Sequence, residues 1–262
     1  SLEANKGAYS YAWMIIFAVI AAIMVLIGLY HIRMLPSNQI PSTTKKTTSE
    51  VGRELVAVIA NFFTKKHIFY YICFIILYRL AEGFIMKIAP LFLRASREVG
   101  GLGLSLKEIG TLNGVFGSAA FVLGSLLAGI YVSKFGLKRT LFTLCCIFNL
   151  PFLAYTFLAV TQPTNVYLIG TCITMEYFGY GFGFVGLTLF MMQQIAPGKH
   201  QMSHYAFASG IMNLGVMLPG MVSGYFSDLL GYRNFFIYVL IATIPAFLIT
   251  YFIPFTYDDS KK

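Results

Sequence analysis

The chain has 262 residues, of which 58% are hydrophobic and only 11% charged, and its mean hydropathy is +0.74. This composition excludes an ordinary soluble domain and predicts an integral membrane protein. The formal net charge is +9. Because the basic residues are scattered between apolar runs and form no continuous patch, nucleic acid is not an expected partner.

Seven apolar stretches are long enough to cross the hydrocarbon core of a bilayer, which takes about 20 helical residues. They cover residues 9–33, 67–93, 106–132, 140–160, 165–195, 205–230 and 235–255. The first stretch does not look like a secretory signal, because its positive residues, His31 and Arg33, follow the apolar run. We therefore expect an all-α protein embedded in the lipid bilayer.

The longest linker, residues 35–66, separates the first stretch from the other six. Its early part has the composition of a flexible loop. Its later part predicts a short amphipathic helix, in which apolar residues recur at helical spacing from Val51 to Phe62. This helix would lie on the cytoplasmic membrane surface, where it either anchors the linker or acts as a strap that governs movement of two halves.

Lys and Arg residues between the stretches predict the orientation, because cytoplasmic loops carry the excess of positive charge. One side would hold Arg33, Lys45, Lys46, Arg53, Lys65, Lys66, Lys134, Lys138, Arg139, Lys199, Lys261 and Lys262. The other side would hold only Lys6, Arg94, Arg97, Lys107 and Arg233. The first side is the predicted cytoplasm, which places residue 1 outside and the C-terminus inside.

Two similar turns indicate an internal repeat. Segments 129–139 (GIYVSKFGLKR) and 224–233 (GYFSDLLGYR) share the spacing of their glycines. By the predicted orientation they face opposite sides of the membrane, as two inverted three-helix units would require. Gly136 and Gly231 suit short turns because glycine adopts backbone conformations that other residues avoid. Asp228 could hold its turn against a neighbour.

Segment 129–139 resembles the cytoplasmic loop signature of the major facilitator superfamily. The match is carried by Gly129, Lys134, Gly136, Lys138 and Arg139. The segment departs from the signature at Ser133, where an acid is usual, and at Leu137, where a base is usual. Segments 77–84 (LYRLAEGF), 105–113 (SLKEIGTLN), 205–209 (YAFAS) and 219–228 (PGMVSGYFSD) resemble the muropeptide permease, or AmpG-like, branch of this superfamily.

The resemblance implies two six-helix halves around a central cavity that opens alternately to either side. Residues 1–34 would then be the last helix of a missing N-terminal half, 35–66 the cytoplasmic linker, and 67–262 the six-helix C-terminal bundle. The implied function is proton-coupled import of peptidoglycan-derived muropeptides across the bacterial cytoplasmic membrane. Transport of another sugar or of an organic anion is the alternative within the same class.

Three buried charges are the candidates for coupling: Arg79 and Glu82 in one apolar stretch, and Glu176 in another. Ionisable groups inside a membrane are expensive and mark functional sites. Arg79 and Glu82 are three residues apart and can pair on one helical face. Because Glu176 is less well paired, it is the expected proton carrier. We hypothesise that its protonation frees Arg79 for an anionic substrate group; a salt bridge joining the two helices is the structural alternative.

Lys87, Tyr177 and Tyr180 are candidate substrate-binding residues. Lys87 could attract a carboxylate or extend to the membrane surface, and the two tyrosine rings could stack on a sugar or simply pack. Asn113, Asn149 and Asn213 are polar residues within apolar stretches, and interhelical hydrogen bonds explain them.

Catalysis finds little support in the sequence. The His and Cys residues lack the spacing of a metal site, and no nucleophile lies beside a plausible base. No catalytic residue, metal or cofactor is expected. An intramembrane enzyme is therefore the weakest alternative, and a receptor or scaffold derived from a transporter fold is another.

Overall fold

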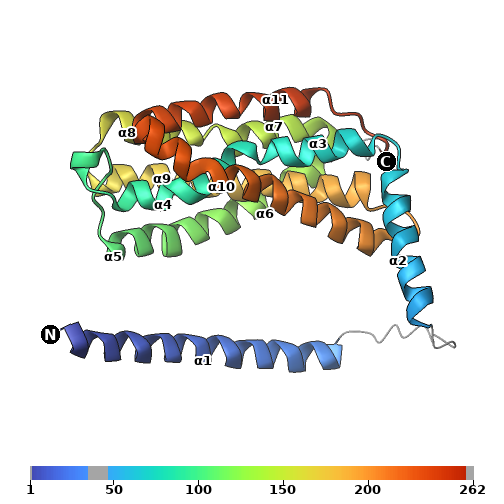
Figure 1. The fold of residues 1–262 in the computed structure, drawn as a ribbon, viewed down its shortest axis with the longest axis horizontal. Helices are drawn as coiled ribbons and strands as arrows, with labels where there is room; N and C mark the ends of the chain where they lie inside the picture. The colour runs from blue at the N-terminus through green and yellow to red at the C-terminus, as the bar shows by residue number, and fades with distance from the viewer. Residues whose placement is uncertain (1, 35–46, 258–262) are drawn as a thin grey trace. The chain divides into compact units, whose positions relative to one another are not determined.

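The computed structural model describes residues 2–34 and 47–257, and the regular elements in these ranges are all helical (Figure 1). The predicted all-α class is therefore confirmed. The first part of the predicted linker, residues 35–46, and the final residues, 258–262, lie outside the described residues. The chain forms two compact parts, and the boundary between Val51 and Gly52 lies in the first turns of a helix that is described with the second part.

The first part is dominated by α1, Leu2–Met34. Large apolar side chains such as Trp13, Phe17 and Leu26 are exposed around its whole circumference. A helix that is apolar on every face needs lipid or other apolar helices around it. The structure of α1 thus suits a membrane-spanning segment.

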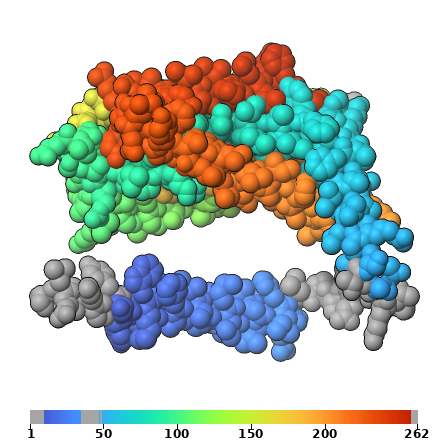
Figure 2. All heavy atoms as spheres, in the orientation of Figure 1, coloured from blue at the N-terminus to red at the C-terminus, as the bar shows by residue number. Residues whose placement is uncertain are grey.

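The second part is a bundle of helices. Its elements are α2 (Thr48–Phe63), α3 (Ile68–Tyr78), α4 (Leu80–Arg94), η1 (Arg97–Val99), α5 (Leu106–Ile109), η2 (Gly110–Gly117), α6 (Ser118–Phe135), α7 (Leu137–Asn149), α8 (Phe152–Thr161), α9 (Val166–Phe190), η3 (Met191–Ile195), α10 (Gln201–Ala242) and α11 (Ile244–Tyr251). Helix α9 packs against α6 and α7, while α10 packs against α4, α3 and α8. Figure 2 shows α3 and α4, in cyan to green, closing against α10 and α11, in orange to red.

Five helical stretches among the described residues are long and apolar enough to cross a membrane: Ser10–Met34, Ile68–Arg94, Leu106–Phe135, Leu137–Thr161 and Gln201–Tyr251. The last covers two of the seven predicted stretches, 205–230 and 235–255. Gly231, whose backbone angles are non-helical, separates these two within α10. Helix α9 is long enough but contains Glu176 and several glycines and tyrosines, which lower its hydropathy. All seven predicted stretches are helical in the structure.

Three of these stretches are broken near their middle. Arg79 separates α3 from α4 with φ −103° and ψ 6°, and Thr243 separates α10 from α11. Between α7 and α8 the break falls at Pro151, whose ring and missing N–H end the preceding helix. The first break matters for function, because it carries a buried charge.

The two repeated turns have nearly the same backbone conformation at their second glycine. Gly136 has φ 79° and ψ 148°, and Gly231 has φ 68° and ψ 160°. This region of backbone space is essentially restricted to glycine. The similarity between segments 129–139 and 224–233 thus extends from sequence to local geometry.

Helices α6 and α9 touch through their backbones. A Cβ atom on Gly124 would collide with the carbonyl oxygen of Phe178, and one on Gly181 would collide with that of Phe121. The Ser125 hydroxyl donates a hydrogen bond of 3.1 Å to the carbonyl oxygen of Gly181. Small residues allow such close contact between apolar helices. This contact fixes the position of α9.

The end of α2 and the residues just after it are docked on the bundle. Phe62 is only 1% exposed and packs its ring 4.8 Å from that of Phe207. Lys65 Nζ donates to the carbonyl oxygens of Ile195, at 2.5 Å, and Pro197, at 2.7 Å, just beyond α9. Most other apolar side chains of α2, including Leu55 and Ile59, stay exposed.

Candidate functional site

The break between α3 and α4 holds a buried ion pair. Arg79 donates from Nε to Glu82 Oε2 at 2.6 Å and from Nη2 to Glu82 Oε1 at 2.5 Å. Arg79 is 4% and Glu82 6% exposed. A bidentate arginine–carboxylate pair is the geometry that best offsets the desolvation of two buried charges. The pair therefore holds the Glu82 carboxylate in a defined position.

The opposite wall of this site comes from α9. The Arg79 guanidinium lies 5.4 Å from the ring centroid of Phe184. Tyr180, one turn before Phe184, interacts electrostatically with both members of the ion pair. Aromatic side chains of α9 thus lie against the Arg79–Glu82 ion pair.

Glu82 and Glu176 line the same cavity, which has a volume of about 160 Å³. The cavity walls also include Asn113, Tyr155, Tyr177 and Tyr180. Glu176 makes no hydrogen bond to any described residue, and its carboxylate is close enough to Glu82 for electrostatic repulsion. The structure therefore brings together two carboxylates from α4 and α9, one paired and one unpaired.

This arrangement differs from the predicted contacts in one respect. The carboxylate partner of Arg79 is Glu82, on the neighbouring turn, and no ion pair between α4 and α9 occurs among the described residues. The alternative of a salt bridge joining the two helices is therefore wrong for this conformation. Glu82 instead lies between them: it pairs with Arg79 and repels Glu176.

Lys87 lies apart from this cavity. Its side chain is exposed and extends along α10, where its Cγ lies 3.3 Å from the position that a Cβ on Gly220 would occupy. Its position is compatible with a lysine whose apolar stem packs on a helix while its ammonium group reaches a polar region.

Asn113 and Tyr155 are site residues that the sequence interpretation missed. Asn113 belongs to the π-helical segment η2, and its buried Oδ1 has no hydrogen-bond partner. Asn149 donates to the carbonyl oxygen of Cys145 in its own helix. The predicted interhelical bonds of Asn113, Asn149 and Asn213 are thus absent among the described residues. The clue to Asn113 was its place in an apolar, glycine-rich stretch.

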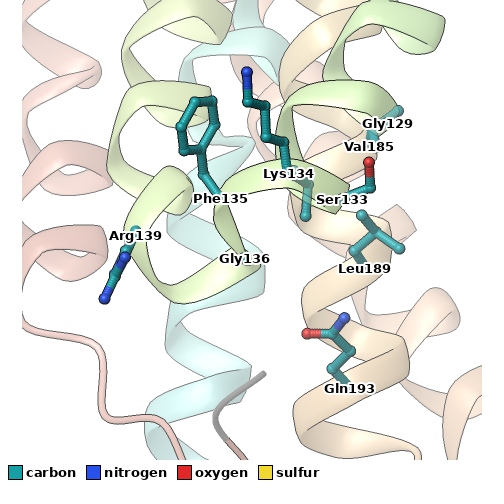
Figure 3. A pocket seen from close by; sticks show the side chains of 10 residues that line it. Gly129, Ser133, Lys134, Phe135, Gly136, Arg139, Val185, Leu189 and Gln193 are labelled. Atoms are coloured by element: carbon teal, nitrogen blue, oxygen red, sulfur yellow. The ribbon is translucent and has the colours of Figure 1, made fainter. Parts of the chain in front are cut away.

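A second cavity, of about 520 Å³, lies beside the 129–139 turn and is lined by Gly129, Ser133, Lys134, Gly136 and Arg139 (Figure 3). Its far wall consists of Val185, Leu189 and Gln193. The Ser133 hydroxyl donates to the carbonyl oxygen of Ile130 within α6. At the position where the family signature has an acid, the hydroxyl of Ser133 therefore bonds within its own helix.

The other turn carries an acidic residue. Asp228, between Gly224 and Gly231, is exposed and interacts electrostatically with Tyr232.

Within residues 2–34 and 47–257, no group of three or more His, Cys, Asp or Glu side chains is arranged to hold a metal ion.

These features define a helical membrane protein with an ionisable cavity between two helices of its bundle. The family model of the Major Facilitator Superfamily matches residues 7–197 of the chain. This protein therefore belongs to the major facilitator superfamily.

The chain is similar to several curated proteins along most of its length. It is 23% identical to the anhydromuropeptide permease of Escherichia coli strain K12 over 209 residues, which is 80% of this chain and 41% of the permease. It is 25% identical over 238 residues to putative transporter AmpG 1 of Rickettsia bellii, covering 89% of this chain and 56% of that protein. Putative transporter AmpG 2 of Rickettsia prowazekii is 27% identical over 204 residues, or 76% and 47%. The chain spans about half the length of the curated relatives it matches.

Proposed function

We propose that the full-length protein containing this chain is a secondary transporter that works by alternating access. The observation that carries the proposal is the cavity in which Glu82, paired with Arg79, faces the unpaired Glu176. Membership of the major facilitator superfamily supports it. An interior ionisable group without a structural partner is best explained by ion or substrate movement.

Residues 67–262 form the C-terminal half of this transporter, as two inverted three-helix units. The matching glycine turns at Gly136 and Gly231 support the repeat. Residues 1–34 supply the last helix of the N-terminal half, and residues 35–66 are the cytoplasmic linker, whose helix α2 lies on the membrane surface. The exposed apolar side chains of α2 support that placement.

The transported solute is a peptidoglycan-derived muropeptide, an amino sugar with an attached peptide. This assignment follows from the similarity to the anhydromuropeptide permease of Escherichia coli. Import across the bacterial cytoplasmic membrane, with the C-terminus in the cytoplasm, fits the distribution of Lys and Arg between the helices. Another sugar or organic anion is the alternative solute.

A proton is the coupling ion, and Glu176 carries it. When Glu176 is ionised, two carboxylates face one guanidinium, and the cavity region has a net negative charge. Proton uptake at Glu176 removes this excess charge and its repulsion of Glu82, so that α9 and α4 can change their separation. Arg79 and Tyr180 hold the Glu82 carboxylate in place, while Tyr177 and Tyr180 contribute the aromatic walls of the substrate path.

Uptake by the full-length protein in proteoliposomes tests this function. A labelled anhydromuropeptide should accumulate unchanged inside the vesicles when a proton gradient is imposed, and accumulation should stop when an ionophore collapses the gradient. A chemically altered solute would indicate an enzyme. Absence of any solute movement would favour a receptor or scaffold and contradict the proposal.

A further inference from the structure

A third cavity, with a volume of about 800 Å³, lies between the α5–η2 segment and the first turns of α9. Thr111 and Leu112 line it from one side, and Thr171, Thr174 and Met175 from the other. This volume is within the range of pockets that bind organic ligands, which is roughly 300 to 1,000 Å³.

The third cavity adjoins the one that contains Glu176. Leu112 and Met175 line the larger cavity, while the residues that follow them, Asn113 and Glu176, line the smaller. The same two helical segments therefore form both.

Each threonine hydroxyl that lines the larger cavity already donates a hydrogen bond to a backbone carbonyl oxygen. Thr111 donates to the carbonyl oxygen of Lys107 at 2.9 Å, Thr171 to that of Tyr167 at 2.9 Å, and Thr174 to that of Gly170 at 2.7 Å. A hydroxyl has one proton and two lone pairs. All three side chains are thus available to a ligand as hydrogen-bond acceptors.

Two neighbouring atoms or groups can also accept hydrogen bonds: the amide oxygen of Asn113 and, when it is ionised, the carboxylate of Glu176. Asn113 Oδ1 is buried without a donor, and the Glu176 carboxylate has no hydrogen bond to the described residues. A buried acceptor left without a donor is unfavourable, so a hydrogen bond from a ligand donor would stabilise the complex here. The buried cation nearby, Arg79, is already held by both oxygens of Glu82. Lys107 also lines the larger cavity and can meet an anionic group of a ligand there.

We propose that this pair of cavities binds the part of the solute that is rich in hydrogen-bond donors, namely sugar hydroxyls and amide N–H groups. A carboxylate would meet the lone pairs of the Thr171 and Thr174 hydroxyls and is disfavoured at that wall. The inference rests on the proposed transport function and specifies which chemical groups of the solute this half of the transporter recognises. It assigns binding roles to Thr171, Thr174 and Asn113.

Removal of the two threonine hydroxyls tests the site in the purified full-length protein. The variants are Thr171→Val, Thr174→Val and the double variant, and the probe is an anhydromuropeptide. Thr161→Val is the matched control, because the Thr161 hydroxyl makes the same kind of bond, to the carbonyl oxygen of Phe157 at 2.7 Å, in α8. Each cavity variant should raise Kd about two- to tenfold, as expected for one lost hydrogen bond, whereas the control should match the unmodified protein.

A chemically altered probe makes the test specific for donors. Methylation of the amide nitrogen atoms of the probe should weaken its binding to the unmodified protein but weaken binding to the double variant much less. The inference is overturned if the threonine variants bind as the control does, if methylation affects both proteins equally, or if the unmodified protein binds no anhydromuropeptide.

The binding assay separates this inference from the transport proposal. Weakened binding in the threonine variants, together with no uptake by the unmodified protein, would support the site and contradict transport. Normal gradient-driven uptake, together with unchanged binding in the variants, would support transport and contradict the site.

Discussion

Arg79 and Glu82 form a bidentate ion pair across the break between α3 and α4, with hydrogen bonds of 2.6 and 2.5 Å. The break places the guanidinium beside the first turn of α4, where its two donors meet the two carboxylate oxygens. Because both side chains are buried, each charge depends on the other. The pair explains how an arginine and a glutamate are tolerated within an apolar stretch.

Glu82→Gln should destabilise the protein, because it leaves the buried guanidinium of Arg79 without its counter-charge. Removal of one partner of a buried pair typically costs about 3 to 5 kcal/mol. Thermal unfolding of the purified full-length protein should show a lower midpoint, while Glu98→Gln, at an exposed position, should show none of this effect. The double variant Arg79→Met/Glu82→Leu should recover much of the lost stability. Equal midpoints for all variants would contradict the structural role of the pair.

Gly181→Ala should disrupt the contact between α6 and α9, since the added methyl group would collide with the Phe121 carbonyl oxygen. Overpacking of this kind typically costs about 1 to 3 kcal/mol. Gly129→Ala is the control, because no atom lies within 4 Å of its added Cβ. The relevant measurement is the thermal midpoint of each variant. If the two variants unfold at the same temperature, the close backbone contact is not present in solution.

Gly136→Ala and Gly231→Ala should each destabilise their turns, because their positive φ angles with extended ψ angles are strained for any residue with a Cβ atom. A cost of about 1 to 3 kcal/mol is expected for each. Gly224→Ala, in the helix before the second turn and with open space around its Cβ, should be neutral or slightly stabilising. A similar loss in all three variants would argue against a special role for the two turns.

Lys65→Met should release the end of α2 from the bundle, because Lys65 Nζ binds the carbonyl oxygens of Ile195 and Pro197. Hydrogen exchange of the backbone amides near the end of α2 should become faster, while exchange in α6 should not change. Lys66→Met, at the adjacent exposed position, is the control. Unchanged exchange in Lys65→Met would show that this segment stays docked without the Lys65 hydrogen bonds.

Much of the architecture could be predicted from local sequence patterns. Runs of apolar residues located the helices, since the thickness of a bilayer sets their length. The three-residue spacing of Arg79 and Glu82 predicted their pairing, and the positions of Gly136 and Gly231 marked turns that need glycine. Each of these inferences depended on residues close together in the chain.

The remaining features depend on contacts between distant segments or on departures from regular helix geometry. Helical periodicity gave no sign of the break at Arg79 or of the π-helical segment that positions Asn113. The meeting of Glu82 with Glu176 follows from the packing of α4 and α9 in the bundle, and Lys65 reaches a carbonyl group 130 residues away.

The most direct test of the central proposal is solute accumulation by the full-length Glu176→Gln variant in proteoliposomes. Glutamine preserves the size of the side chain but cannot take up or release a proton. In this variant an imposed pH gradient should no longer drive anhydromuropeptide accumulation, while exchange of labelled for unlabelled solute across the membrane should continue. Accumulation that responds to the gradient as strongly as in the unmodified protein would contradict the role of Glu176 as proton carrier.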